Sequence, residues 1–140
     1  MTQLIPYLAF NGNCREAMTF YQACLGGKLD VQTVGESPIA EQTPAALHAL
    51  VVHSALMHDG TMLLFASDMM GDEEPVQGNT VTLCLNCRSE DEITTFFANL
   101  SEGAQVTEPL RTEFWGATFG QLTDKFGMRW MLNYDHNQPA

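Results

Sequence analysis

The 140-residue sequence is poor in cationic residues and has no long apolar run. Only 6 Lys and Arg stand against 17 Asp and Glu, so the formal net charge is -11 at pH 7. A surface with so few cations cannot neutralise many phosphates, which excludes nucleic acid and anionic membranes as expected partners. The longest apolar runs, such as Ala49–Val52 and Met62–Ala66, are far shorter than the roughly 20 residues that span a bilayer. Because the N-terminus also lacks a basic region followed by an apolar one, we expect a cytoplasmic protein.

The sequence holds 4 cysteines but no complete cysteine motif. Cys14 and Cys24 fall on a predicted helix, and Cys84 and Cys87 fall at the end of a predicted strand. A Cys-x-x-Cys pair is half of a zinc site or the centre of a redox motif, but no second pair accompanies this one. The redox motif also belongs at a strand-to-helix turn, whereas Cys84 lies within the apolar alternation of its strand. Since no export signal is present, we predict four reduced, structural thiols.

Two halves of the chain repeat one pattern. In the first half, a strand leads to an Asn cap with a Glu three residues on, and the amphipathic helix that follows stops at two glycines: Leu4–Phe10, Asn13, Glu16 and Gly26-Gly27. In the second half, a strand, a capping box and a helix occur in the same order: Thr80–Asn86, Ser89–Glu92 and Ile93–Leu100. The pair Phe20-Tyr21 falls on Phe96-Phe97 when the halves are superposed. This similarity indicates a duplicated unit.

Each half continues with strand-like segments in the same order. Two runs and a turn with a closing strand follow the helix in each half: Leu29–Val34, His48–Met57 and Asp59–Phe65 in the first, and Gln105–Leu110, Ala117–Thr123 and Phe126–Leu132 in the second. The fold class is therefore α+β, with two tandem βαβββ repeats in a curved, mostly antiparallel sheet of eight strands whose helices cover the outer face. We predict a single domain over residues 1–140, made of repeats 1–70 and 78–140.

Several motifs resemble one known family. They are the run Pro6–Cys14, Glu16-Ala17, Phe20-Tyr21, His53, Ser67-Asp68, Phe114-Trp115-Gly116 and Asp124–Gly127 with Trp130. Together they resemble the PhnB-like proteins of the glyoxalase/bleomycin resistance/dioxygenase (vicinal oxygen chelate) superfamily, often named 3-demethylubiquinone-9 3-methyltransferase-like. The resemblance implies the paired βαβββ fold, a homodimer and a cavity inside each curved sheet, but no established reaction. The methyltransferase name conflicts with the sequence, which has no glycine-rich strand-to-helix turn followed by an acidic residue.

Metal-using relatives place His and Glu ligands on the first and last strands of each repeat. Superposition of the helix and turn motifs puts these residues at the corresponding positions: Pro6, Leu8, Leu64, Phe65, Thr80, Thr82, Met131 and Asn133. None is a His, Asp, Glu or Cys, and a divalent ion needs three or more such groups. We therefore expect no metal and no other cofactor. The alternative is a metal site whose ligands lie at other positions.

Two polar residues are candidates for catalysis. His53 lies in a strand, and alternation would place it on the same face as Val51, Ala55 and Met57. It is either a core histidine with a hydrogen-bond partner or a base or donor in the cavity, since imidazole titrates near neutral pH. Asp68 ends the fourth strand and either caps the following turn or holds an imidazole or ligand.

Four aromatic residues are candidates for ligand binding. Tyr7 and Phe10 on the first strand and Trp130 on the last would line the sheet, although packing alone also explains them. Trp115 follows a loop and either seals the core or forms a wall of the cleft.

The sequence leaves three functions open. The first is a homodimer that binds a small, partly apolar molecule in the concave sheet without a metal, either sequestering it or catalysing an acid-base step through His53. The second is a metal-dependent lyase or dioxygenase of the glyoxalase type. The third is a protein that traps a planar drug between aromatic residues, as bleomycin-resistance relatives do. Covalent catalysis has no support, because the sequence shows no Ser, His and acid set at recognisable spacing.

Overall fold

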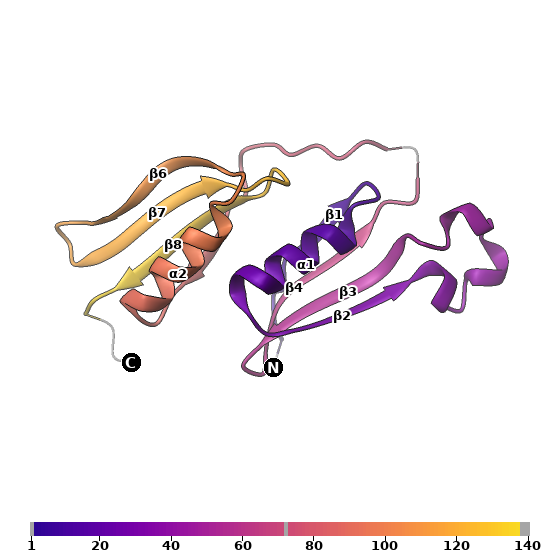
Figure 1. Ribbon diagram of the computed structural model, residues 1–140, viewed down its shortest axis with the longest axis horizontal. Helices are drawn as coiled ribbons and strands as arrows, with labels where there is room; N and C mark the ends of the chain where they lie inside the picture. The colour runs from indigo at the N-terminus through magenta and orange to yellow at the C-terminus, as the bar shows by residue number, and fades with distance from the viewer. Residues whose placement is uncertain (1, 72, 138–140) are drawn as a thin grey trace. The chain divides into compact units, whose positions relative to one another are not determined.

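The computed structural model describes residues 2–71 and 73–137. The chain divides into two compact units, Met1–Val76 and Gln77–Ala140. Each unit contains one strand, one helix and then three strands (Figure 1). The predicted tandem βαβββ organisation is therefore confirmed.

The first unit builds a four-stranded sheet with one helix. Its elements are β1 (Tyr7–Phe10), α1 (Cys14–Leu25), β2 (Lys28–Thr33), β3 (Val51–His58) and β4 (Thr61–Asp68). The strand order is β1-β4-β3-β2, with β1 parallel to β4 and the other pairs antiparallel. Three short 3-10 segments follow one another between β2 and β3: Val34–Glu36, Ala40–Gln42 and Ala45–Leu47.

The second unit repeats this architecture. Its elements are β5 (Leu83–Asn86), α2 (Glu90–Leu100), β6 (Gln105–Thr112), β7 (Ala117–Thr123) and β8 (Arg129–Asp135). The order β5-β8-β7-β6, again with one parallel pair at the edge, matches the first sheet strand for strand. The mixed, mostly antiparallel character predicted from the sequence is confirmed in both sheets. The joining of all eight strands into one curved sheet stays a prediction.

Two strand boundaries differ in the same way from the prediction. β1 begins at Tyr7 rather than Leu4, and β5 begins at Leu83 rather than Thr80. In the first case Pro6 precedes the strand, and a proline has no N–H to donate to a ladder. β3 begins at Val51 rather than His48, because the chain just before it is still turning in a 3-10 segment.

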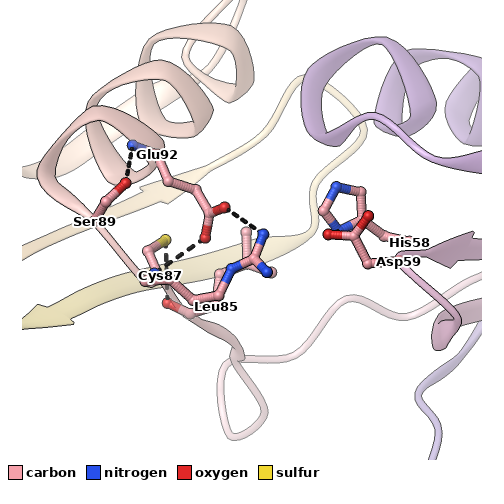
Figure 2. Close-up of polar contacts among 7 residues, drawn as sticks. His58, Asp59, Leu85, Cys87, Ser89 and Glu92 are labelled. Carbon is pink, nitrogen blue, oxygen red and sulfur yellow. Dashed lines mark hydrogen bonds and ion pairs between the residues drawn. The ribbon is translucent and has the colours of Figure 1, made fainter. Parts of the chain in front are cut away.

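The two helices begin with different caps. The Ser89 hydroxyl accepts a hydrogen bond from the Glu92 N–H at 3.0 Å, as the predicted capping box requires (Figure 2). The second bond of the predicted box is displaced by one residue, because the Glu92 carboxylate accepts from the backbone N–H and the guanidinium of Arg88, at 3.1 and 3.0 Å, rather than from the Ser89 N–H. At the first helix the Asn13 side chain makes no capping bond, so the predicted Asn cap is wrong. The carboxylate of Asp68 takes that role from across the unit.

The hairpin between β3 and β4 turns on Asp59-Gly60. Both residues have positive φ, 51° and 77°, which is the backbone that a two-residue hairpin turn between twisted strands requires. The Asp59 carboxylate lies 3.6 Å from the ring of His58 (Figure 2). Asp and Gly tolerate this conformation better than other residues, so the sequence encodes the turn locally.

Each sheet buries one face under the helix of its own unit. In the first unit the buried strand residues Leu8, Leu56, Leu64 and Ala66 accompany the buried helix residues Met18, Tyr21 and Leu25. In the second unit the corresponding set is Leu122, Trp130 and Leu132 with Ile93 and Leu100. Packing there is close at Gly120, where a Cβ atom would lie 2.6 Å from the Phe97 ring. Among the residues that the structure describes, the other face of each sheet carries no α-helix of its own unit, and it is called the helix-free face below.

Candidate functional site

Strand register places a row of four residues across the helix-free face of the first unit. Tyr7 pairs with Phe65, Phe65 pairs with Ala55, and Ala55 pairs with Asp30. Their neighbours along the strands, such as Leu8 and Leu56, are buried on the helix-covered face. Because side chains alternate between faces along a strand, the row belongs to the opposite face.

A second row lies beside the first. His53 pairs with Gln32 on β2. The register that pairs Ser54 with Ala66, continued by one residue, brings His53 opposite Ser67 of β4. His53 is thus the titratable group of a row whose other members are small or uncharged.

Three rings from different strands meet on this face. The rings of His53 and Phe65 have centroids 5.1 Å apart, and those of Tyr7 and Phe65 are 6.2 Å apart in an edge-on arrangement. The Tyr7 and His53 rings are 6.4 Å apart. These separations lie in the range of favourable aromatic contacts, and Tyr7 remains 55% exposed. We call this group the Tyr7–His53–Phe65 cluster.

His53 is exposed and does not belong to the core. The prediction that it shares a face with Val51 is wrong, since Val51 is 1% exposed. The reason is a register shift in the pairing of β2 with β3, which passes from Gln32 opposite His53 to Thr33 opposite Val51. A bulge of this kind reverses the side to which the next residues point. Met57 is exposed and lies on the same face as His53, as predicted.

Asp68 is a structural carboxylate in this fold. It is 6% exposed, and one oxygen accepts hydrogen bonds from the N–H groups of Gly12 at 2.9 Å and Cys14 at 3.0 Å. The other oxygen accepts from the Val51 N–H at 2.8 Å. The predicted roles of capping the following turn or holding an imidazole are therefore corrected. Asp68 fixes the start of α1 and of β3, on the face opposite His53.

Two of the predicted ligand-binding aromatics are core residues. Phe10 is 3% exposed and Trp130 is 2% exposed. The indole N–H of Trp130 donates to one oxygen of Asp124 at 2.8 Å, and the other oxygen accepts from Phe126 and Met128 N–H groups. Burial corrects the assignment of both residues to a ligand surface. Asp124 thereby holds the turn between β7 and β8.

Trp115 lies at the connection between β6 and β7. It is 56% exposed, and its ring meets Phe114, itself 95% exposed, edge-on at 5.1 Å. Trp115 therefore does not seal the core of its unit. Its predicted part in ligand binding stays a prediction.

The cysteines are free, and three of them are buried. Burial raises the pKa of the Cys87 thiol to about 12 and that of Cys14 to about 11. The Cys87 sulfur lies 3.9 Å from the carbonyl oxygen of Leu85 (Figure 2). Burial also raises the pKa of Cys84, although this residue is exposed. Redox and zinc chemistry need thiolates, and these environments favour thiols.

The positions equivalent to metal ligands differ in part from the prediction. On β5 the helix-free face carries Cys84 and Asn86, which pair with Met131 and Asn133 of β8, whereas Thr80 and Thr82 precede the strand. The side-chain amide of Asn133 donates to the Asn86 oxygen at 3.1 Å. Within residues 2–71 and 73–137, no group of three or more His, Cys, Asp and Glu is arranged to hold a metal ion.

Two further features escaped sequence reasoning. An open pocket of about 510 Å³ lies between the first turn of α1 and the start of β3, lined among others by Arg15, Thr19 and Ala49. In the second unit the buried Thr118 hydroxyl lies 2.7 Å from the His136 ring and 3.2 Å from the Glu90 carboxylate. Both features bring together residues that are far apart in the sequence, so no local motif predicts them.

Comparison with known proteins identifies the class to which this fold and its helix-free face belong. The Glyoxalase/Bleomycin resistance protein/Dioxygenase superfamily matches residues 3–132. The chain therefore belongs to this superfamily. No helix among the residues described by the structure is long and apolar enough to cross a membrane.

Individual relatives place the chain in the PhnB-like branch, as its motifs predict. It is 32% identical to Protein YjdN of Escherichia coli (strain K12) over 146 residues, which covers 98% of each protein. It is 38% identical to protein PA1353 from Pseudomonas aeruginosa, with a TM-score of 0.83 over 96% of this chain and 98% of that one. A PhnB protein from Bacillus cereus, which carries the name 3-demethylubiquinone-9 3-methyltransferase, is 25% identical, with a TM-score of 0.74 over 95% and 99% of the chains.

Proposed function

We propose that this protein binds a small, partly apolar molecule on the helix-free face of its first unit, against the Tyr7–His53–Phe65 cluster. The observation that carries the proposal is the exposure of Tyr7 and His53 beside the half-buried Phe65. Aromatic side chains that contact one another and are at least partly open to solvent form an apolar surface with a polar edge, which suits a ligand of mixed character. The neighbouring Ala55 and Ser67 are small, so they leave room above the sheet.

His53 gives this surface one group that can move a proton. It is exposed beside two apolar rings, and a ligand lying on Phe65 would come within reach of the imidazole. The proposed chemistry is binding, with a single acid-base step if the ligand carries an acidic proton. No metal takes part in this proposal. We also retain the homodimer implied by the family as part of it.

A fragment screen tests the binding proposal. Monocyclic and bicyclic aromatic fragments are screened by saturation-transfer NMR against the intact protein, and hits are repeated with Tyr7→Ala and Phe65→Leu. Both variants should weaken the same hits at least several-fold, because each removes part of the ring surface. Phe114→Ala is the matched control, since it removes an exposed aromatic ring outside the cluster.

Two results would oppose the proposal. Hits that persist in both cluster variants would place binding elsewhere, and hits lost only in Phe114→Ala would favour the aromatic pair at Trp115. For any turnover discovered, His53→Ala should abolish the reaction while the circular dichroism spectrum stays unchanged. Metal analysis of protein purified without a histidine tag addresses the metal-dependent alternative, which a full equivalent of Zn, Ni, Mn or Fe would support.

A further inference from the structure

An acidic side chain stands at one end of the ring-bearing row. Asp30 lies on the same face as Phe65, with Ala55 between them. Because neighbouring strands are about 4.8 Å apart, the backbones of Asp30 and Phe65 are separated by roughly 10 Å. Among the residues that the structure describes, the Asp30 carboxylate has no hydrogen-bond or ion-pair partner. The residue between acid and rings, Ala55, has a single methyl group as its side chain.

The surrounding unit is strongly negative. Residues 1–76 contain nine Asp and Glu against one Arg and one Lys, a net charge of -7 out of the -11 of the whole chain. A field of this sign raises the local concentration of cations and lowers that of anions. Lys28 is on the same face as Asp30. It lies two residues before Asp30 on β2, on the side away from the row of His53.

The rings favour the same sign of charge. The faces of Tyr and Phe rings carry negative electrostatic potential and attract cationic nitrogen. A flat apolar body on Phe65 with a protonated nitrogen directed toward Asp30 would satisfy both ends of the row. An anionic group in the same place would meet the carboxylate and the ring faces unfavourably.

We infer that the Tyr7–His53–Phe65 cluster selects planar ligands that carry a cationic nitrogen, and that Asp30 holds the nitrogen. This inference rests on the proposed function and adds the class of ligand to it. It assigns to Asp30 a role in specificity that the sequence alone does not indicate.

Three probes with one ring system test the inference. Naphthylmethylamine is cationic, naphthylmethanol is neutral, and naphthoate is anionic at pH 8. Their affinities for the full chain are measured by equilibrium dialysis at low salt. We expect the amine to bind tightest and naphthoate weakest. Asp30→Asn should weaken amine binding about fivefold with little change for the alcohol, and Lys28→Gln should strengthen it.

Glu41→Gln is the matched control, since it removes one exposed acid from the same unit without touching the row. It should leave the preference for the amine nearly intact, and added salt should reduce that preference in every variant. Equal affinities for the three probes, or an unchanged ratio in Asp30→Asn, would overturn the inference while the proposed function stands. Failure of all three probes to bind would overturn both.

Discussion

Removal of the Asp68 carboxylate is expected to destabilise the first unit strongly. The carboxylate is 6% exposed and accepts bonds from three backbone N–H groups, those of Gly12, Cys14 and Val51, at 2.8 to 3.0 Å. A hydrogen bond to a charged group contributes about 1.5–3 kcal/mol, and losses at one centre are not fully additive. We therefore expect Asp68→Ala to lower the free energy of unfolding by about 3–5 kcal/mol. Asp68→Asn keeps one carbonyl acceptor and should cost about 2 kcal/mol.

Urea denaturation followed by far-UV circular dichroism measures this loss, and amide hydrogen exchange locates it. The N–H groups of Gly12, Cys14 and Val51 should lose protection first, because Asp68 is their acceptor. Asp30→Asn is the control, as an exposed acid of the same unit whose replacement should change stability by less than about 0.5 kcal/mol. A similarly small change in Asp68→Ala, with the three amides still protected, would refute the structural role and return Asp68 to the candidate catalytic residues.

Three further outcomes are expected. A thiol reagent at pH 8 should modify Cys84 in the native protein and all four cysteines after unfolding, because Cys14, Cys24 and Cys87 are buried; rapid native modification of several thiols would contradict this. Burial raises the pKa of Cys87 from 9.0 to about 12, so between these values the unfolded chain releases a proton that the folded chain retains. Stability should fall as pH rises through that window and fall less in Cys87→Ala, as urea midpoints at pH 8 and 10 would show. Sedimentation equilibrium should give twice the chain mass, and a monomer at all concentrations would remove the homodimer from the proposal.

The order of elements was predictable from sequence because each repeat contains its own local signals. Ser89 with Glu92 starts α2, and the glycines after Leu25 end α1. These signals act over a few residues, so pattern recognition finds them. The cap of α1 was missed because its acceptor is Asp68, more than 50 residues away in sequence. Only tertiary structure brings the two together.

The candidate site was predictable only in part, because the face of a strand residue depends on register. Tyr7 and Phe10 are three residues apart on one strand, so they must point to opposite faces, and only one of them can line a ligand surface. The structure leaves Tyr7 open and buries Phe10. For β3, the predicted alternation correctly placed Met57 on the same face as His53. It wrongly placed Val51 there too, because a bulge interrupts the alternation between Val51 and His53. Bulges have no reliable local signature.

The two repeats bury corresponding core residues, each within its own unit, but differ on their helix-free faces, which leads to a last prediction. The first unit presents three rings and Asp30, whereas the strands β5 and β8 present Cys84, Met131 and the bonded pair Asn86 and Asn133. The amide pair already satisfies itself, and Phe119, the ring that pairs with Asn133 on this face, lies beside the cationic Arg111 on its other side. That face is therefore less suited to a planar cation.

In an NMR titration with naphthylmethylamine, ring signals of Tyr7, His53 and Phe65 should shift, and the side-chain amide signals of Asn86 and Asn133 should not. Met131→Leu is the control, because it alters the second face while leaving the first intact. Larger shifts at the asparagines than at the rings would mean that the second repeat carries the ligand. Duplication kept the residues that fold each unit, whereas the residues of the helix-free faces differ between the two copies.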